Sequence, residues 1–539
     1  MKNLYRGLAL VLFLSMLLIA GCSSDEKASS ENYELTDVSF PLEEEVTLKF
    51  ITESSPMAPE DPNDKLILQR LEEETGVHIE WKNYTGESFA EQRNLAVASG
   101  DLPDAIMNAG YSDYELLDLA DEGAIVPVED LIDQYMPNLQ AVLEKAPEYR
   151  AMMTAPDGHI YAFPWIEELG SGKESIHSLD ATGWINVEWL NELGLEMPST
   201  TEELKEALIA FKENDMAGDG QTIPMSFIIN HGGEDLSFLF SPFGEGENWD
   251  HTVVTNDDKV LFTSGQDGYK DAITYLNELY ELGLMDVEAF EQEWNTYLAK
   301  GKEERYGLYF TWDKANITGM NDKYDMLPPL EGPDGRIHVA RSNGMGFDRA
   351  RMVVTSANEN LELTAKWIDQ LYDPHQSVQN NWGTYGHEEK QNIFEFDEDK
   401  KMLRHLPLEG TAPVELREET SIGGPLAILD EYYGDVTTMP DDAAWRLEQL
   451  HENLVPYMNN ENIYPNVFMS LEELEQLSDI EADLFPYVER KKAEWITNGN
   501  VEEEWEEYLA ELDRLGYQEW LEIKQTAYDR NREAEVEAQ

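Results

Sequence analysis

The chain contains a single cysteine, Cys22, among its 539 residues, so no disulfide bond can form within it. Its stability must therefore come from the burial of apolar surface. Hydrophobic residues make up 41% of the sequence, which is sufficient for large cores. We expect more than one domain, because single domains usually contain about 100–200 residues.

The residues before Cys22 have the pattern of an export signal. Lys2 and Arg6 are positively charged, residues 8–18 are apolar, and the small residues Ala20 and Gly21 directly precede the cysteine. The apolar run is shorter than the ~20 residues of a membrane-spanning helix. The segment resembles the lipobox of bacterial lipoprotein precursors; the alternative is an ordinary secretory signal with a chance cysteine.

The lipobox resemblance implies a lipoprotein signal peptide over residues 1–21 and a diacylglyceryl group on the Cys22 thiol. Two acyl chains suffice for stable membrane attachment. We therefore expect the mature protein on the outer face of the cytoplasmic membrane, held there by its lipid anchor. Residues 22–45 are polar and acidic, which is typical of a flexible tether.

The charge of the chain excludes one large class of partners. It has 38 Lys and Arg residues against 110 Asp and Glu residues, a formal net charge of −72. Phosphate backbones require clustered basic side chains, so nucleic acid is not a partner. We interpret the acidic runs as solvated surface rather than as specific cation sites.

The start of the fold has an alternating strand and helix pattern. Residues 46–51 alternate with period two, residues 64–74 carry apolar side chains at helical spacing, and residues 77–81 alternate again. Gly76 is placed to cap the helix. This β-α-β order predicts an α/β fold with a largely parallel sheet.

Further helices are predicted along the chain. Thr200 and Glu203 fit a capping box before a helix that extends to Phe211. Residues 272–280 and 361–372 have helical spacing, and the second of these stops at Asp373-Pro374. The section from residue 470 onward is rich in Glu, Leu and Trp and is expected to be helical. Trp189 and Trp367 are assigned to the core.

Three segments together resemble one protein family. They are Ala96-Val97-Ala98-Ser99-Gly100-Asp101-Leu102-Pro103-Asp104, then Asp157-Gly158-His159-Ile160-Tyr161-Ala162-Phe163-Pro164, and then residues 184–204. In this order and spacing they are similar to family 1 extracellular solute-binding proteins of ABC transporters. The size of the chain and residues 367–374 point to the large LipO-like lipoprotein subgroup.

The resemblance implies an α/β, two-lobed periplasmic-binding-protein-like fold of type II, with a crossover hinge and a helical C-terminal section. We expect crossovers near Tyr161–Trp165 and near Arg341–Phe347, where Gly344 and Gly346 are either hinge glycines or part of a plain loop. The expected segments are 46–164 for the first part of the N-lobe, 165–342 for the first part of the C-lobe, 343–432 for the N-lobe return and 433–539 for the C-lobe helical section.

Many members of this family carry a calcium loop after the helix that ends near Phe211. The corresponding segment here, residues 215–224, is two residues shorter, has Ala217 at the third position and lacks the acidic pair before Ile223-Pro224. Asp215 and Asp219 are the only carboxylates left in it. We therefore predict no cofactor and no bound metal, with calcium at Asp215 and Asp219 as the minor alternative.

No motif for covalent or metal-assisted catalysis is visible in the sequence. The ten histidines lack metal-ligand spacing, and Gly170-Ser171-Gly172-Lys173-Glu174 lacks the glycine and hydroxyl of a phosphate-binding loop. We therefore predict that the protein is not an enzyme and has no catalytic residues. A pair of carboxylates suited to glycoside cleavage stays an open alternative, because so many carboxylates are present.

Aromatic residues close to loop signals are the candidate ligand-binding groups. Sugar rings stack on indole rings through their C–H faces. Their hydroxyl groups accept hydrogen bonds from basic side chains and donate hydrogen bonds to carboxylates. Each ring has a structural alternative in the core or at the rim. The candidates are Trp165, Trp249, Trp312, Asp313, Trp382 and Tyr385.

The resulting functional hypothesis is a lipid-anchored binding protein that captures an extracellular oligosaccharide between two lobes and delivers it to the permease subunits of an ABC importer. Two alternatives remain at this point. One is an extracellular glycan-active enzyme, and the other is a binder of a peptide or another small solute on the same scaffold.

We predict that Cys22→Ser prevents lipidation, and that the protein is then released or left uncleaved. Ligand affinity is expected to be unchanged, because the tether separates the anchor from the fold. Metabolic labelling with a fatty acid, followed by binding assays, measures both. Label retained on the Cys22→Ser protein would contradict the lipobox interpretation.

Overall fold

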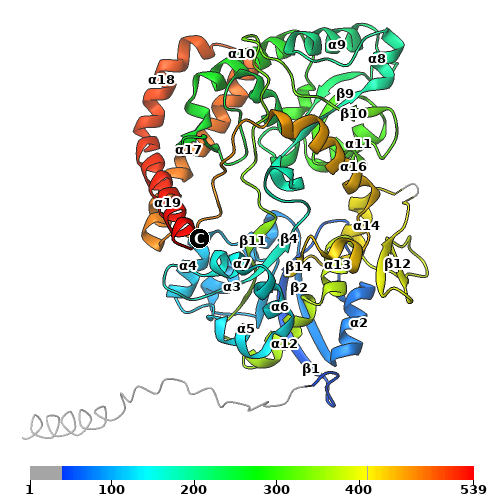
Figure 1. Ribbon diagram of the computed structural model, residues 1–539, viewed down its shortest axis with the longest axis vertical. Helices are drawn as coiled ribbons and strands as arrows, with labels where there is room; N and C mark the ends of the chain where they lie inside the picture. Colours follow the sequence, from blue (N-terminus) through cyan, green and yellow to red (C-terminus); the bar gives the residue numbers. More distant parts are fainter. Residues whose placement is uncertain (1–38, 409–410, 539) are drawn as a thin grey trace, which may run out of the picture. The chain divides into compact units, whose positions relative to one another are not determined.

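Two mixed β-sheets organise residues 39–408 and 411–538, the part of the chain that the computed structural model describes (Figure 1). The predicted signal peptide, Cys22 and most of the predicted tether lie outside the described residues. Within the described ranges, no helix is long and apolar enough to cross a membrane.

The first sheet has six strands in the order β14-β4-β11-β3-β1-β2. Strands β1, β2 and β3 are parallel, and β11 is antiparallel to β3 and β4. The predicted β-α-β opening is confirmed: β1 and β2 flank α2 (Leu66–Thr75), which Gly76 ends in the left-handed conformation at φ 71°. The strands are β1 (Val46–Glu53), β2 (Val77–Tyr84), β3 (Ala105–Met107), β4 (Phe163–Glu167), β11 (Phe347–Val354) and β14 (Leu426–Ile428).

Short helices pack around this sheet, and Trp367 in α12 is almost fully buried, as predicted. Its ring meets the ring of Phe50 from β1 edge to face. Helix α12 ends at Leu371, just before Asp373-Pro374 as predicted. Asp373 caps the next helix, because its carboxylate accepts from the backbone N–H groups of His375 and Gln376. The helices are α3 (Glu87–Ser99), α4 (Asp113–Asp121), α5 (Glu129–Tyr135), α6 (Pro137–Lys145), α7 (Pro147–Met153), α12 (Leu361–Leu371) and α13 (Pro374–Trp382).

The second sheet has four strands in the order β10-β5-β9-β6. Trp184 on β5 and Trp189 on α8 are buried beneath its helices, so the core assignment of Trp189 is confirmed. The strands are β5 (Thr182–Asn186), β6 (Ile223–Ser226), β9 (Tyr306–Thr311) and β10 (Tyr324–Met326), and the helices are α8 (Val187–Leu193), α9 (Thr201–Glu213), α10 (Asp267–Glu281) and α11 (Trp294–Lys302). Two small hairpins are β7–β8 (Thr252–Val254, Val260–Phe262) and β12–β13 (Phe394–Asp397, Met402–His405).

Only half of the predicted capping box at α9 forms. The Thr200 hydroxyl accepts a hydrogen bond from the Glu203 backbone N–H at 3.0 Å, as predicted. The Glu203 carboxylate, however, accepts from the backbone N–H of Ser199 at 2.9 Å rather than from that of Thr200. The Ser199 hydroxyl also donates to this carboxylate, which explains the shift by one residue.

The chain passes between the two sheets later than the sequence predicted. Phe163–Glu167 is still a strand of the six-stranded sheet, so the first crossing follows Glu167 rather than lying at Tyr161–Trp165. The apolar side chains of that segment are buried within the sheet, because β4 pairs with β11 on one side and with β14 on the other. The chain returns at Phe347, and Gly346 before it has φ 64° and lies where a Cβ atom would collide with the Glu167 carbonyl oxygen. The predicted lobe boundaries stay a prediction.

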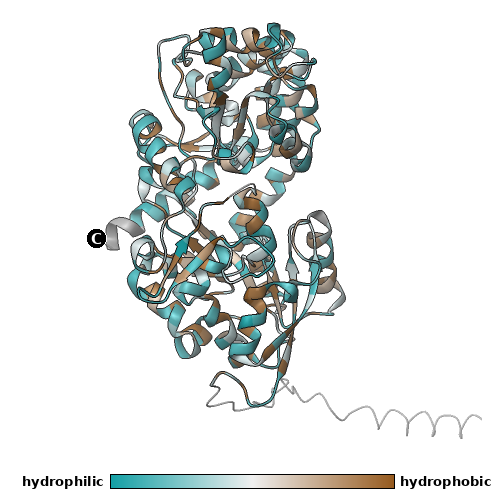
Figure 2. Ribbon diagram, turned by 90° about the vertical axis from the view of Figure 1, so that its right-hand side faces the viewer, coloured by the Kyte–Doolittle hydropathy of each residue, from teal (hydrophilic) through white to brown (hydrophobic). Residues whose placement is uncertain are grey.

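The C-terminal section is helical, as predicted, and packs against the helices of the four-stranded sheet. Helix α17 lies beside α10 and also contacts α4 and α19, and the three final helices are drawn in orange and red in Figure 1. Figure 2 shows that hydrophobic residues gather on the strands and on the inner helix faces. The remaining helices are α14 (Pro413–Thr420), α15 (Tyr432–Asp435), α16 (Asp441–Gln449), α17 (Leu471–Asn498), α18 (Val501–Arg514) and α19 (Tyr517–Ala538).

Candidate ligand-binding cleft

A cleft of about 600 Å³ is lined by helices, loops and the β12–β13 hairpin, which lie outside the two main sheets. One wall comes from Lys302 in α11 and from residues 315–320, which follow β9. The opposite wall comes from α13, the β12–β13 hairpin and α14, and the start of α16 closes one side. Its polar and aromatic lining includes Trp382, His405, Glu415, Arg417 and Asp442.

Trp382 and Arg417 form the central pair of this cleft. Trp382 is the last residue of α13, and Arg417 lies one helix later, on α14. The Arg417 guanidinium carbon lies 4.0 Å from the centre of the Trp382 ring, a cation–π contact. Burial lowers the Arg417 pKa, although the carboxylates of Asp442, Glu167 and Asp313 act in the opposite direction. The guanidinium therefore lies over an indole and close to three carboxylates.

A second pair of the same kind is formed by Trp312 and Arg446. Neither residue lines the cleft itself, but the Asp313 carboxylate acts on both Arg417 and Arg446. The Arg446 guanidinium carbon lies 3.8 Å from the centre of the Trp312 ring. His177 packs on Trp312 with ring centres 5.7 Å apart, and Trp165 meets the same histidine edge to face at 6.2 Å. The structure thus brings the candidates Trp165 and Trp312 together through His177.

Three carboxylates surround these two guanidinium groups. Burial raises the pKa of Glu167 to about 7 and the pKa of Asp313 to about 6. Glu167 accepts a 2.6 Å hydrogen bond from the Asn381 side-chain amide, and Asp313 accepts one from the Ala315 backbone N–H at 2.8 Å. Asp442 lines the cleft and is only partly buried. The site therefore offers both donors and acceptors of hydrogen bonds.

Two buried donors of one arginine lack a hydrogen-bond acceptor among the described residues. They are Nε and Nη1 of Arg446. Nε1 of Trp382 and the hydroxyl of Tyr433 interact with each other. Burial lowers the pKa of Arg446 to about 10, which reflects the cost of removing this cation from water. Buried polar groups in proteins almost always have partners. The N–H groups of Arg446 are therefore available to an acceptor that comes from outside the described residues.

The remaining two candidates lie elsewhere. Tyr385 stacks on Phe396 of the β12–β13 hairpin, with Arg70 above its ring at 4.5 Å, and it does not line the cleft. Trp249 lies in the loop between the 3-10 helix η5 (Ser237–Phe243) and β7 and is 67% exposed, and its backbone N–H donates to the Asp180 carboxylate at 3.5 Å. No contact joins Trp249 to Trp312 or Trp382 in the described part of the chain.

Sequence reasoning missed the arginines, His177 and Glu167. Arg417 and Arg446 lie on helices rich in acidic residues, where an arginine usually faces solvent, and no motif marks their burial. His177 lies in an irregular segment without a motif. The one weak signal is the scarcity of basic residues, 38 against 110 acidic ones. Because burying an arginine costs free energy, each arginine in such a chain is a candidate for a specific role.

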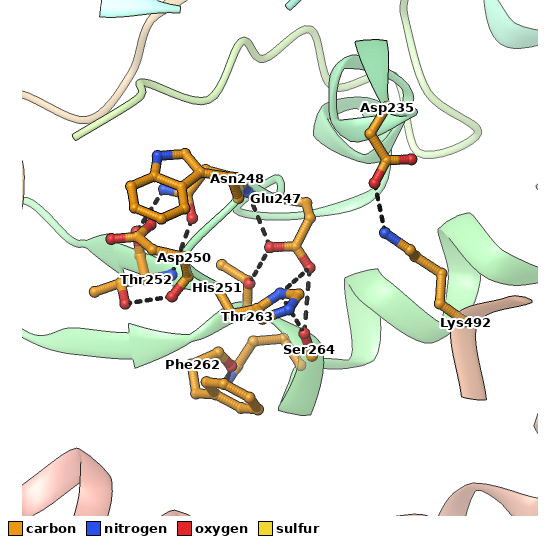
Figure 3. Close-up of polar contacts among 12 residues, drawn as sticks. Asp235, Glu247, Asn248, Asp250, His251, Thr252, Phe262, Thr263, Ser264 and Lys492 are labelled. Carbon is orange, nitrogen blue, oxygen red and sulfur yellow. Dashed lines mark hydrogen bonds and ion pairs between the residues drawn. The ribbon is translucent and has the colours of Figure 1, made fainter. Parts of the chain in front are cut away.

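A second polar cluster lies inside the lobe of the four-stranded sheet and bears on the enzyme alternative (Figure 3). Glu247 accepts from Thr263 and Ser264, and it forms an ion pair with His251 at 3.1 Å. The Ser264 hydroxyl and the Glu247 carboxylate both contact Nδ1 of His251, whereas a catalytic triad uses the two different ring nitrogens. These side chains are buried and hold the loop before β7 in place.

The loop at residues 215–224 closes on itself through hydrogen bonds. The Asp215 carboxylate accepts from the Gly220 backbone N–H at 2.7 Å and from the Thr222 hydroxyl at 2.9 Å. These bonds lower the Asp215 pKa. No group of three or more His, Cys, Asp or Glu side chains suited to a metal ion occurs in the described ranges. The loop supplies two carboxylates, Asp215 and Asp219, whereas calcium takes six to eight oxygen ligands, so the absence of bound calcium stays a prediction.

The two lobes, the crossing segments and the aromatic cleft between them define a solute-binding protein. The family model for the bacterial extracellular solute-binding protein matches residues 61–376. The chain belongs to this family, as the sequence motifs predicted.

Individual relatives agree with this assignment. The fructooligosaccharide ABC transporter substrate-binding protein FusA of Streptococcus pneumoniae is 59% identical over 523 residues, which is 97% of each chain. Its structure in complex with kestose matches with a TM-score of 0.89 over 90% of this chain and 100% of that one. Lipoprotein LipO of Bacillus subtilis is 24% identical over 73% of this chain and 76% of its own length. By their names, FusA is a substrate-binding protein and LipO is a lipoprotein, and the family is extracellular.

We predict that a chelator changes the melting temperature little. Hydrogen bonds from Gly220 and Thr222 already hold the Asp215 carboxylate. The stability of the loop is therefore expected not to depend on calcium. Another FusA structure, 60% identical to this chain, is described as an EF-hand mutant, so that protein makes a suitable comparison in differential scanning calorimetry. A chelator-induced drop of many degrees in this protein would contradict the prediction.

We also predict that Glu167→Gln changes how stability depends on pH. The pKa of Glu167 is about 7 in the folded state and near 4.5 when unfolded, so the folded state binds more protons between these values. The wild type therefore loses stability relative to the variant as pH rises from 4.5 to 7, at about 1.4 kcal/mol per unit of pKa shift.

Denaturant unfolding of both proteins at pH 4.5, 6 and 8 measures this difference. His177, whose pKa burial lowers to about 4, contributes with the opposite sign but is present in both proteins. A constant stability difference across this pH range would show that Glu167 is not buried as described.

Proposed function

We propose that this protein captures a fructooligosaccharide in the cleft between its lobes and delivers it to the permease of an ABC importer. The observation that carries the proposal is the pair of stacked units, Arg417 on Trp382 and Arg446 on Trp312. The name of FusA and the kestose in its structure support the ligand class.

Each stacked unit suits a sugar for a physical reason. An indole holds the guanidinium plane in place, so its N–H edge is preorganised to donate to neighbouring hydroxyl oxygens. The unsatisfied Arg446 donors and the carboxylates of Glu167, Asp313 and Asp442 complement a ligand with many hydroxyl groups. A peptide would match this set less well, because it offers fewer hydroxyl groups to the carboxylates.

The wider setting of the proposal is a lipid-anchored receptor. Cys22 in its lipobox would carry the lipid anchor on the outer face of the cytoplasmic membrane. Residues 22–45 would link this anchor to the fold, so that the protein can reach the importer. The two lobes would close on the sugar by a hinge motion about the crossing segments, which include residues 168–181 and 327–346. The candidate residues Trp165, Trp312, Asp313 and Trp382 would contact or support the ligand, whereas Trp249 and Tyr385 lie apart from this group.

Product analysis distinguishes this binding protein from the alternative, a glycan-active enzyme. Isothermal titration calorimetry with kestose, nystose and, as a control, maltotriose measures binding to the wild-type protein. Chromatography of the same sugars after long incubation measures cleavage. We expect saturable binding of the two fructans, no binding of maltotriose and unchanged sugar. Cleaved product, or the absence of fructan binding, would overturn the proposal.

We predict that Trp312→Ala and Trp382→Ala each weaken kestose binding by roughly tenfold or more, because truncation removes an aromatic anchor and the platform of an arginine together. Calorimetry measures the affinity, and solution scattering measures the ligand concentration at which the protein compacts. The matched control is Tyr385→Ala, which removes an aromatic ring outside the cleft. Wild-type affinity in both tryptophan variants would assign these rings to structure alone.

A further inference from the structure

Lys65 is a buried lysine that precedes α2 and contacts the end of another helix. Its side chain is 6% exposed, and its Nζ donates to the carbonyl oxygens of Ser421 at 2.6 Å and Glu418 at 3.2 Å. Both acceptors lie at the C-terminal end of α14. Carbonyl groups at such an end lack intrahelical donors and carry partial negative charge, so an ammonium group stabilises them.

The contact leads directly to Arg417. The backbone N–H and the hydroxyl of Ser421 both donate to the Arg417 carbonyl oxygen, each at 2.8 Å. Ser421 thus accepts from Lys65 and donates to Arg417. A continuous chain of hydrogen bonds joins Lys65 to the backbone of the residue whose guanidinium stacks on Trp382.

The other end of α14 is held from across the cleft. Lys302 of α11 forms an ion pair with Glu415, and the Glu415 carboxylate also accepts from the Ala412 backbone N–H at 3.4 Å. The Lys302 and Glu415 side chains are 49% and 30% exposed, so this pair contributes little energy. The C-terminal end of α14, by contrast, contacts the buried ammonium group of Lys65.

Keeping Lys65 buried has a cost in free energy. Burial lowers its pKa to about 8, with the Glu418 carboxylate raising the pKa and the Lys390 ammonium lowering it further. Its two short contacts use backbone carbonyl groups rather than a carboxylate. Replacement by an apolar side chain would remove the burial cost but leave two carbonyl groups without their donor.

We propose that Lys65 is a positioning residue for ligand binding, which holds the C-terminal turn of α14 so that Arg417 stays on Trp382 and faces the cleft. Lys65 does not line the cleft and acts only through Ser421 and Arg417. The inference rests on the proposed role of the cleft in sugar capture.

Lys65→Met tests the proposal, because it keeps the length of the side chain and removes its donors. We expect faster hydrogen exchange in residues 413–421, measured by mass spectrometry without ligand, and kestose affinity weakened by about tenfold, or about 1.4 kcal/mol. The matched control is Asp369→Asn in the same lobe. Asp369 is also a buried ion that caps a helix, accepting from the Asn138 and Leu139 backbone N–H groups of α6, away from the cleft.

A chemical rescue guards against a variant that folds poorly. In a Cys22→Ser background, Lys65→Cys places the only thiol of the chain at position 65. Alkylation with bromoethylamine in denaturant, followed by refolding, regenerates a lysine-like ammonium group. We expect the alkylated protein to recover slow exchange in α14 and wild-type affinity, and the unalkylated protein to recover neither.

The outcomes separate this inference from the proposed function. Unchanged exchange in α14 of Lys65→Met overturns the inference whether or not sugar binds. Faster exchange with unchanged kestose affinity, or an equal loss of affinity in Asp369→Asn, also overturns it. Failure of the wild type to bind any fructan overturns the proposed function instead. In that case the hydrogen-exchange rates of residues 413–421 in Lys65→Met still show whether Lys65 holds α14.

Discussion

The stacking of guanidinium groups on indole rings in a buried setting is the interaction on which the cleft depends. Arg417 lies on Trp382 and Arg446 lies on Trp312, and burial lowers the pKa of both arginines. Such cations are expensive to bury without full pairing. In the proposed function, hydrogen bonds to a bound sugar offset this free-energy cost. The unpaired N–H groups are then already oriented toward the hydroxyl oxygens of the ligand.

The rest of the fold positions these pairs from separate parts of the chain. Trp382 ends α13 and Arg417 lies on α14, both near the six-stranded sheet, while Trp312 follows β9 of the four-stranded sheet and Arg446 lies on α16. Residues of α11, α13, α14, α16 and the β12–β13 hairpin line one cleft. Hinge motion about the crossing segments would therefore change the spacing between the two stacked units, which couples ligand capture to closure.

The sequence predicted the regular parts of this structure well and the site only in outline. The period-two pattern at Val46 and the glycine at position 76 identify β1 and the end of α2, because local spacing and backbone freedom determine both. The motifs identify the family. Arg417 and Arg446 could not be found, because their burial results from contacts over long sequence separations. The first crossing was placed too early for the same reason: Phe163–Glu167 pairs with β11 and β14, which come some 180 and 260 residues later.

The crystal structure of the protein with kestose tests the central claim most directly. The account predicts one sugar in the cleft, with hydroxyl oxygens within hydrogen-bond distance of Nε or Nη1 of Arg446 and of the Arg417 guanidinium, and with a ring against Trp312 or Trp382. A sugar bound elsewhere, with both guanidinium groups still lacking acceptors, would contradict it.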